Sequence, residues 1–321
     1  MTPRRILVVS ASPQALNVNN RLPGYLAAGL REAFPDADTV LAAYEAGRRA
    51  ALDLNPDLAV VFGSVMLDET DYHPLANAVR RGGGRLVFWL HDDPYEFDAH
   101  TRVVPLADAI FTNDLASLDV YPPVLPVHHL ALGAYPAAHH RPVTVRAGPE
   151  LFFCGHLYGN RRRLLEEIAA RVPDLDRRAL FLGTGVPTGA VPGWQAMTVA
   201  NDELAGFTNA ALAVINVGRD HDLANARLLI RASTPGPRTF EAGMSGAAQI
   251  VVGDGFEIED FYAPGAEVLL ADGVEGVIEH WERLARDPSA SLAIGRAAQD
   301  RTLAEHTYTH RARRLVSLAM A

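Results

Sequence analysis

The chain has 321 residues, of which 29 are basic and 38 are acidic, so its formal net charge is −9, and every basic residue other than histidine is an arginine. The absence of lysine excludes Schiff-base chemistry and the P-loop and protein-kinase signatures, all of which need a lysine amine. Any bound phosphate must therefore be held by arginine, backbone N–H groups or helix N-termini. Hydrophobic residues make up 49% of the chain, which is typical of a folded globular protein, and the length predicts two domains.

Short apolar runs alternate with amphipathic stretches along the first part of the chain. Continuous apolar runs of this length predict strands of a parallel sheet that is covered on both faces. The predicted strands are 6–9, 58–62, 85–90, 109–112 and 127–130, and the predicted helices are 21–34 and 74–81. Pro35 ends the first helix, and the glycines at 82–84 end the second, because glycine tolerates the left-handed conformation at a helix C-terminus.

The segment 136–149 interrupts this alternation. It contains Pro136, Pro142 and Pro149 and has little periodicity, so we interpret it as a linker between domains. The same pattern then resumes, with predicted strands at 151–153, 179–182, 212–217, 249–252 and 267–270 and predicted helices at 161–171, 202–211, 237–245, 274–286, 289–305 and 309–320. The sequence therefore predicts an α/β protein with two doubly wound, Rossmann-like domains that face each other across a cleft, with ligands beyond the carboxyl ends of the strands.

The sequence shows no sign of export or of membrane insertion. Cys154 is the one cysteine, so no internal disulfide can form, which fits a reducing compartment. The apolar run 6–9 is too short for a signal peptide, and no stretch approaches the ~20 apolar residues of a membrane span. The acidic charge has no basic stripe beside it, which argues against a nucleic-acid partner. We therefore expect a cytoplasmic protein.

A turn that contains glycine follows the predicted strand 151–153. Gly155 and Gly159 separate this strand from a predicted helix whose first turn carries Arg161, Arg162 and Arg163. Glycine lets the backbone approach an anion closely, and a helix N-terminus attracts negative charge. Arginines in a first turn oppose the helix dipole, and a bound anion would explain them. The alternative is a surface helix with solvated arginines.

A second candidate site begins the predicted helix 237–245. Pro237 suits the first turn of a helix, and Arg238 and Glu241 are three positions apart, so they share one helix face. The carboxylate can accept both hydroxyls of a ribose while Arg238 and the helix end hold a diphosphate. The alternative is that Glu241 only stabilises the first turn.

A third candidate site follows the predicted strand 85–90. His91, Asp92 and Asp93 lie at the carboxyl end of this strand, where they suit proton transfer or the binding of sugar hydroxyls. One alternative is a metal site, but two adjacent carboxylates alone make a poor site for a hard cation. The other alternative is a structural Asp-Pro turn.

These motifs occur in an order that resembles the CgeB-like glycosyltransferases, also called spore maturation protein-like, which have the two-domain GT-B fold. The resemblance rests on the segments 89–98, 107–114, 152–162 and 238–246, on Asn216 after a strand, and on the tail 306–311. It implies that a nucleotide-diphosphate sugar is bound by a C-terminal domain over 150–305. An acceptor would be bound by an N-terminal domain over 1–135, and the helix in 306–321 would pack back towards that first domain.

The resemblance also implies roles for individual residues. Glu241 resembles the glutamate that holds the nucleotide ribose, and His91 resembles a histidine that contacts the transferred sugar. Asp92 or Asp93 is the candidate base if the reaction inverts the anomeric centre. The implied donor-binding residues are Gly155, Tyr158, Asn160, Arg161, Gly183, Asn216, Arg238, Thr239 and Glu241.

One departure from the family pattern concerns the donor sugar. Many retaining relatives carry Glu-x7-Glu before this helix, but the position eight residues before Glu241 is Ser233. The stereochemistry therefore stays open, with a retaining reaction preferred.

The resulting hypothesis is a glycosyltransferase that uses a UDP or dTDP sugar and no metal or other cofactor. Its hexosyl group would pass to a hydroxyl of a small molecule, such as a natural-product scaffold. The alternatives are a nucleotide-sugar epimerase on the same fold and a non-catalytic module that binds nucleotide sugars.

Overall fold

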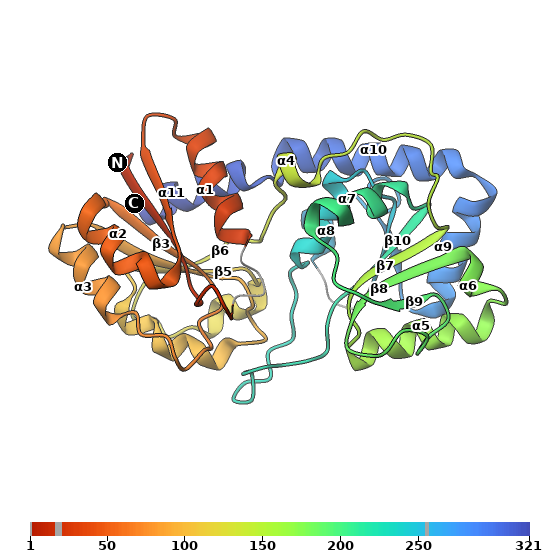
Figure 1. Cartoon of the computed structure of the whole chain (residues 1–321), viewed down its shortest axis with the longest axis horizontal. Coiled ribbons are helices and arrows are strands. Elements are labelled where there is room, and N and C mark those ends of the chain that lie inside the picture. The colour runs from red at the N-terminus through yellow and green to blue at the C-terminus, as the bar shows by residue number, and fades with distance from the viewer. Residues whose placement is uncertain (1, 17–20, 254–256) are drawn as a thin grey trace. The chain divides into compact units, whose positions relative to one another are not determined.

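The computed structural model of the chain describes residues 2–16, 21–253 and 257–321 (Figure 1). The chain divides into two compact units. Unit 1 consists of Met1–Leu132, Asp222–Thr234 and Tyr308–Ala321, and unit 2 consists of Gly133–His221 and Pro235–Thr307. Residues 222–234, which fall inside the predicted range 150–305, thus belong to unit 1.

Unit 1 is built on one parallel sheet with the strand order β2-β1-β3-β4-β5-β6. Its strands are β1 (Arg5–Ser10), β2 (Asp38–Ala42), β3 (Leu58–Gly63), β4 (Arg85–Leu90), β5 (Ala109–Thr112) and β6 (Val127–His129). The four central strands are almost fully buried, as their continuous apolar runs predict. The sequence analysis missed β2, because this edge strand has exposed residues and no continuous apolar run.

Helices cover both faces of this sheet (Figure 1). The helices of unit 1 are α1 (Leu22–Ala33), α2 (Gly47–Leu54), α3 (His73–Arg81) and α11 (Tyr308–Ala319). On one face Trp89 stacks on Phe62 with ring centroids 4.3 Å apart, and Tyr308 of α11 lies against both rings. Helix α11 packs on α1 at Gly29, where an added Cβ would lie 2.6 Å from the Tyr308 carbonyl. The last helix of the chain is thus part of the core of unit 1.

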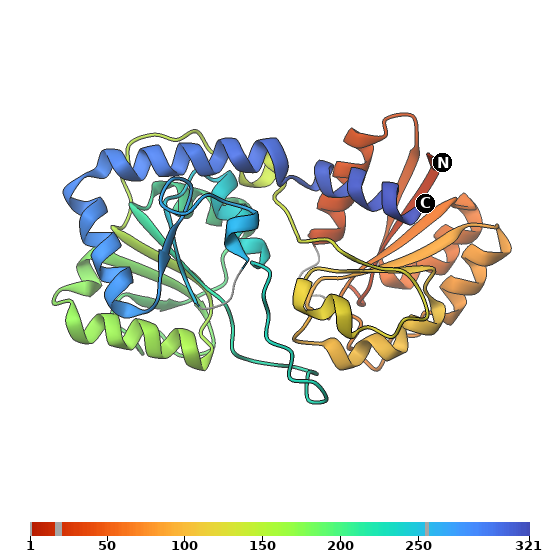
Figure 2. The same cartoon turned by 180° about the vertical axis from the view of Figure 1, so that it is seen from behind.

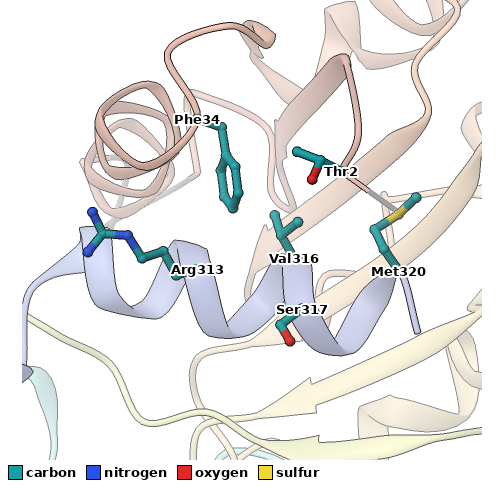
Figure 3. Close-up of a pocket in the computed structure, with 6 residues that line it drawn as sticks. All are labelled: Thr2, Phe34, Arg313, Val316, Ser317 and Met320. Atoms are coloured by element: carbon teal, nitrogen blue, oxygen red, sulfur yellow. The ribbon is translucent and has the colours of Figure 1, made fainter.

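An open pocket of about 370 Å³ lies beside α11 (Figure 3). It is lined by Thr2, Phe34, Arg313, Val316, Ser317 and Met320. Thr2 precedes β1 and Phe34 follows α1, so the pocket lies at the amino end of the sheet. Ligands of doubly wound sheets bind at the opposite, carboxyl end, so this pocket is not a candidate for the main site.

Unit 2 is built on a second parallel sheet, with the strand order β12-β11-β10-β7-β8-β9. Its strands are β7 (Leu151–His156), β8 (Ala179–Thr184), β9 (Trp194–Ala196), β10 (Ala213–Val217), β11 (Gln249–Val252) and β12 (Leu269–Ala271). Its helices are α4 (Pro136–His139), α5 (Gly159–Arg171), α6 (Leu175–Arg178), α7 (Asn201–Ala210), α8 (Pro237–Met244), α9 (Val274–Arg286) and α10 (Pro288–Glu305). Helices α9 and α10 are drawn in blue in Figure 2, as is α11 of unit 1.

The core of unit 2 has two layers because alternate strand residues point to opposite faces. Phe153 and Ile215 pack with Leu165 of α5 and Trp281 of α9 on one face. Phe152 and Val214 pack with residues of α7 and α8 on the other face. Helices α5 and α8 are thereby fixed on opposite faces, and both begin near the carboxyl ends of the strands.

The structure confirms the predicted alternation of strands and helices and the two Rossmann-like sheets. Each predicted strand and helix is present within a few residues of its expected bounds. The sequence analysis missed β9 as well as β2, together with the helices α2, α4 and α6. Among the residues that the structure describes, no helix has both the length and the apolar character needed to cross a bilayer.

Candidate functional site

The sheet of unit 2 reverses its winding between β7 and β10. From β7 the chain passes to β8 and β9 on one side, whereas β10, β11 and β12 lie on the other side. The segments that follow β7 and β10 therefore leave the sheet towards opposite sides. Doubly wound sheets bind ligands at such a point. The predicted donor-binding residues are the ones that flank this reversal.

The side chain of Arg161 occupies the end of the sheet at this reversal. Its Nε donates to the carbonyl oxygens of Val217 (3.1 Å) and Gly218 (3.2 Å), and Nη2 donates to Val217 (2.8 Å). On the other side, Nη1 donates 3.0 Å to the carbonyl oxygen of His156. The guanidinium also lies 5.3 Å from the ring centroid of Tyr158, within cation–π range. Arg161 thus joins the ends of β7 and β10 and leaves one positive charge between them.

Asn160 completes this connection. Its Nδ2 donates 3.0 Å to the carbonyl oxygen of Gly218, the same oxygen that Arg161 binds. The first turn of α5 is thereby attached to the segment after β10. Arg162 and Arg163, by contrast, are exposed and pair with Glu166 and Asp220. Of the three consecutive arginines, Arg161 is the one that lies at the reversal.

Two predicted glycines allow the strands to end in this way. Gly155 and Gly183 are paired in register between β7 and β8. A Cβ at Gly183, which has φ +151°, would lie 1.8 Å from the carbonyl oxygen of Gly155. A Cβ at Gly155 would in turn lie 3.3 Å from Nη1 of Arg161. The absent side chains are thus required by close packing of the strand ends and the guanidinium.

An aromatic group borders the same end of the sheet. The Tyr158 ring stacks on His221 with centroids 5.2 Å apart and lies 4.4 Å from the ring of His156. His156 Nδ1 lies 3.0 Å from the hydroxyl of Thr184, at the end of β8. Burial lowers the pKa of His156, and the neighbouring Arg161 lowers it further, so the neutral ring is favoured. The Tyr158 ring is therefore packed between neighbouring groups at the end of the sheet.

Helix α8 carries the second group of predicted donor-binding residues. It begins at Pro237, and Arg238 in its first turn is 37% exposed. Nη1 of Arg238 lies 3.0 Å from Oε2 of Glu241, which is almost buried. Asn216, next to the end of β10, donates 2.7 Å from Nδ2 to the hydroxyl of Thr239. The structure thus brings together the four predicted residues Asn216, Arg238, Thr239 and Glu241.

A histidine that the sequence analysis did not select lies beside Glu241. Nε2 of His139, from the short helix α4, is 3.7 Å from Oε1 of Glu241. Burial lowers the pKa of His139, although the carboxylate of Glu241 opposes that effect. No sequence pattern relates His139 to Glu241, which lies 102 positions later. The carboxylate is thus held between a guanidinium and a neutral imidazole.

In unit 1 the three predicted catalytic residues follow β4. His91 and Asp93 are buried, and Asp92 is half-buried. The His91 ring packs edge-on against Phe62, with centroids 6.4 Å apart. The structure thus places these three residues at the carboxyl end of the sheet. Asp92 differs from the other two because it is partly exposed to solvent.

Asp93 is bound inside unit 1 rather than directed to solvent. The hydroxyl of Tyr121 donates a hydrogen bond to Oδ2 of Asp93. Burial raises the pKa of Asp93 to about 7, against the opposing effect of hydrogen bonds from Tyr121 and Thr112. Burial also raises the pKa of Tyr121, so its hydroxyl stays protonated and keeps donating. Of the two candidate bases, Asp92 is the one with access to solvent.

Another polar pair near this end of the sheet was not anticipated. The hydroxyl of Ser64, directly after β3, donates 2.6 Å to Oε2 of the buried Glu96. Ser12, which follows β1, donates 2.9 Å to the carbonyl oxygen of Ser64. The sheet of unit 1 reverses its winding between β1 and β3, so this pair lies where a ligand of unit 1 is expected.

Two other chemistries would use a cysteine nucleophile or a bound metal ion. The thiol of Cys154 is partly buried, and burial raises its pKa, which disfavours the nucleophilic thiolate. Within 2–16, 21–253 and 257–321, no group of three or more histidine, cysteine, aspartate or glutamate residues has the geometry to hold a metal ion.

Comparison with known proteins supports the two-domain fold. Residues 161–317 match a family model described as glycosyl transferase-like. The solved structure of HepE from Anabaena in complex with UDP and glucose matches with a TM-score of 0.64 and 11% identity, over 99% of this chain and 99% of that chain. Sucrose-phosphate synthase from Thermosynechococcus elongatus matches with a TM-score of 0.63 and 12% identity, over 99% and 98%. The chain has the GT-B fold.

The matches to GT-B structures extend beyond transferases. A putative UDP-N-acetylglucosamine 2-epimerase from Listeria monocytogenes matches with a TM-score of 0.56 and 10% identity, over 99% of this chain and 96% of that chain. No protein of curated function matches the sequence. The residues that match the glycosyl transferase-like model include β10, α8 and most of α5.

Arg161→Lys should destabilise the protein, because an ammonium group cannot reach carbonyl oxygens on both sides of the reversal with a planar set of donors. We expect a loss of about 2 kcal/mol, equivalent to a fall in Tm of about 4–8 °C by circular dichroism. Arg162→Lys is the matched control, since the exposed Arg162 makes only a surface ion pair with Glu166. Equal shifts in Tm for the two variants would contradict the bridging role of Arg161.

Asp93→Asn should become progressively more stable than the unaltered chain as the pH rises from about 4 to about 7. The neutral carboxyl of Asp93 favours folding below its unfolded pKa, and this contribution is lost as the pH rises through its folded pKa of about 7. The difference should level off above that pH, as measured by Tm across a buffer series. The control is Asp57→Asn, because hydrogen bonds lower the pKa of Asp57 and its effect should not change between pH 5 and 8. A pH-independent difference for Asp93→Asn would refute the buried neutral carboxyl.

Proposed function

We propose that the chain is a glycosyltransferase that moves a hexosyl group from a nucleotide-diphosphate sugar to a hydroxyl of a small-molecule acceptor. The observation that carries the proposal is the pairing of Arg238 with Glu241 in the first turn of α8, with Arg161 at the reversal of the same sheet. One guanidinium and one helix N-terminus suit a diphosphate, and one carboxylate suits a ribose. The match of 161–317 to the glycosyl transferase-like model supports the same assignment.

In this proposal the groups of unit 2 divide the donor between them. Arg238, Thr239 and the N–H groups at the start of α8 bind the diphosphate, and Glu241 accepts hydrogen bonds from the ribose. Tyr158 borders the donor and keeps Arg161 in place through its cation–π contact, and the fixed charge of Arg161 favours the phosphates. Because the chain has no lysine, these arginines and backbone groups supply the positive potential. UDP is the preferred nucleotide, with dTDP as the other candidate, and HepE was crystallised with UDP.

The reaction breaks the bond between the anomeric carbon and the diphosphate oxygen and forms one to the acceptor oxygen. The negative charge that develops on the leaving diphosphate is stabilised by arginine and helix N–H groups, with no resident metal. In a retaining reaction, which we prefer, the acceptor proton passes to the leaving phosphate and His91 orients the sugar. In an inverting reaction Asp92 takes that proton, because Asp93 is engaged with Tyr121.

The proposal also includes a family, a cellular location and a role for each part of the chain. The order of the motifs supports a CgeB-like relative that works in the cytoplasm on a natural-product scaffold or another small molecule. The donor-binding part is 150–305 without 222–234, which belong to unit 1, the acceptor-binding part includes 1–135, and 136–149 links them. The proposed reaction uses no metal cofactor.

UDP should stabilise the unaltered chain, and Arg238→Ala should weaken its binding by about tenfold or more, because a charge-assisted contact to phosphate contributes at least ~1.5 kcal/mol. Calorimetric titration with UDP measures both affinities. Glu241→Gln should weaken binding of UDP more than binding of inorganic pyrophosphate, since only UDP carries the ribose. Arg286→Ala is the control, because Arg286 forms an exposed pair with Glu282 in α9. No binding of UDP, dTDP or GDP to the folded chain would overturn the proposed function.

The epimerase alternative is favoured by the match to the Listeria protein and has a separate test. Incubation of the chain with UDP-glucose or UDP-N-acetylglucosamine alone should leave the configuration of the sugar unchanged in the NMR spectrum. Addition of a panel of hydroxylated acceptors should release UDP with formation of a glycoside. Conversion of a nucleotide sugar to its epimer without any acceptor would replace the transferase with the epimerase.

A further inference from the structure

The segment between β10 and α8 leaves unit 2 and returns to it. Residues 222–234, which we call the strap, belong to unit 1, while the residues on either side belong to unit 2. The strap begins four positions after Gly218, whose carbonyl oxygen binds Arg161, and ends three positions before Pro237, the first residue of α8. It therefore connects, through the chain itself, the two elements proposed to hold the donor.

The strap has a fixed internal structure. The side chain of Asn225, which is 2% exposed, closes its middle. Oδ1 of Asn225 accepts 3.1 Å from the N–H of Ile230, and Nδ2 donates 2.8 Å to the Ile230 carbonyl oxygen. Ile230 in turn packs against the core of unit 1. The strap is thus a built part of unit 1.

The first half of the strap is attached to the loop that follows β4. The N–H groups of Leu223 and Ala224 donate 2.9 and 2.8 Å to the carbonyl oxygen of Tyr95. Oδ2 of Asp98 accepts from the N–H groups of Ala226 (2.8 Å) and Arg227 (3.2 Å). The loop that carries His91 and Asp92 therefore continues directly into the residues that hold the strap.

The second half of the strap is attached through Asp114, which is 1% exposed. Oδ2 of Asp114 accepts 2.9 Å from both the Ser233 and the Thr234 N–H groups. In return, the hydroxyl of Ser233 accepts 3.1 Å from the N–H of Ala116, and the hydroxyl of Thr234 accepts 3.0 Å from the N–H of Leu115. Each side thus satisfies backbone donors of the other, in the manner of a reciprocal cap.

We propose that Asp114 is a positioning residue for the donor: by fixing Ser233 and Thr234 on unit 1, it orders the start of α8 and thereby links nucleotide binding to unit 1. The link from Thr234 to Arg238 passes through Pro235, Gly236 and Pro237, and the two prolines stiffen it. Without the hydrogen bonds of Asp114, a bound nucleotide must order this segment itself, and the entropy lost in doing so reduces the affinity. The inference rests on the proposed function.

Asp114→Asn keeps the size of the side chain but replaces one acceptor oxygen by an NH₂ group, which cannot accept from backbone N–H groups. We expect its Kd for UDP to rise about three- to tenfold by calorimetric titration. Thr234→Val, a milder change on the strap side, should raise it in the same direction by a smaller factor. Hydrogen exchange should show that UDP protects the amides of 222–236 in the unaltered chain and less so in Asp114→Asn.

Asp57→Asn is the matched control. Asp57 is also a carboxylate of unit 1 that accepts two backbone N–H groups, from Arg4 and Arg5, but it has no contact with the strap. A purely structural role of Asp114 would lower Tm in both variants and leave the Kd for UDP unchanged in both. That result, or an unchanged Kd in Thr234→Val together with unchanged exchange, would overturn the proposal. Failure of the unaltered chain to bind UDP would instead overturn the proposed function as well, so the two failures are distinguishable.

Discussion

The guanidinium of Arg161 joins the carbonyl oxygens at the ends of β7 and β10, and the geometry of this end of the sheet depends on this one side chain. Strand ends at a reversal of winding diverge, which leaves backbone acceptors that no strand neighbour can satisfy. Arginine satisfies them with several donors in one plane and still contributes a full positive charge. The glycines at 155 and 183 are consequences of the same arrangement, because side chains there would displace the strand ends or the guanidinium.

The absence of lysine can be related to the position of Arg161. The sequence predicts that arginine replaces lysine at any phosphate site, but it cannot select among Arg161, Arg162 and Arg163, since all three fall in one helical turn. The packing of α5 determines which of the three arginines lies at the strand ends. Because α5 buries its apolar side against the sheet, Arg161 points towards the strand ends, whereas Arg162 and Arg163 form surface ion pairs. A difference of about 100° per residue around a helix is therefore enough to separate a site residue from a solvated one.

The fold was largely predictable and the site only in part, for reasons that differ. Apolar runs reveal buried central strands, so β1, β3, β4, β7 and β10 were found, whereas the short edge strands β2 and β9 carry exposed residues and no such run. The cluster of Arg238, Thr239 and Glu241 was found because its members are neighbours on one helix. His139 and Asp114 were not found, because their partners lie about a hundred positions away and no local pattern records such a contact. Position 114 was noticed within a motif, but its function depends on the strap.

The strap also accounts for the departure at position 233, where many retaining relatives have the first glutamate of Glu-x7-Glu. In this chain the hydroxyl of Ser233 lies 3.5 Å from Oδ1 of Asp114, which is buried and already accepts backbone N–H groups. A glutamate at 233 would bring a second carboxylate to a buried one, and burial makes such a pair costly unless one of them takes up a proton. The buried carboxylate of Asp114 therefore favours an uncharged side chain at 233. In the proposed transferase, recognition of the donor sugar therefore uses no carboxylate at 233, because the residue there is a serine whose N–H is bound by Asp114.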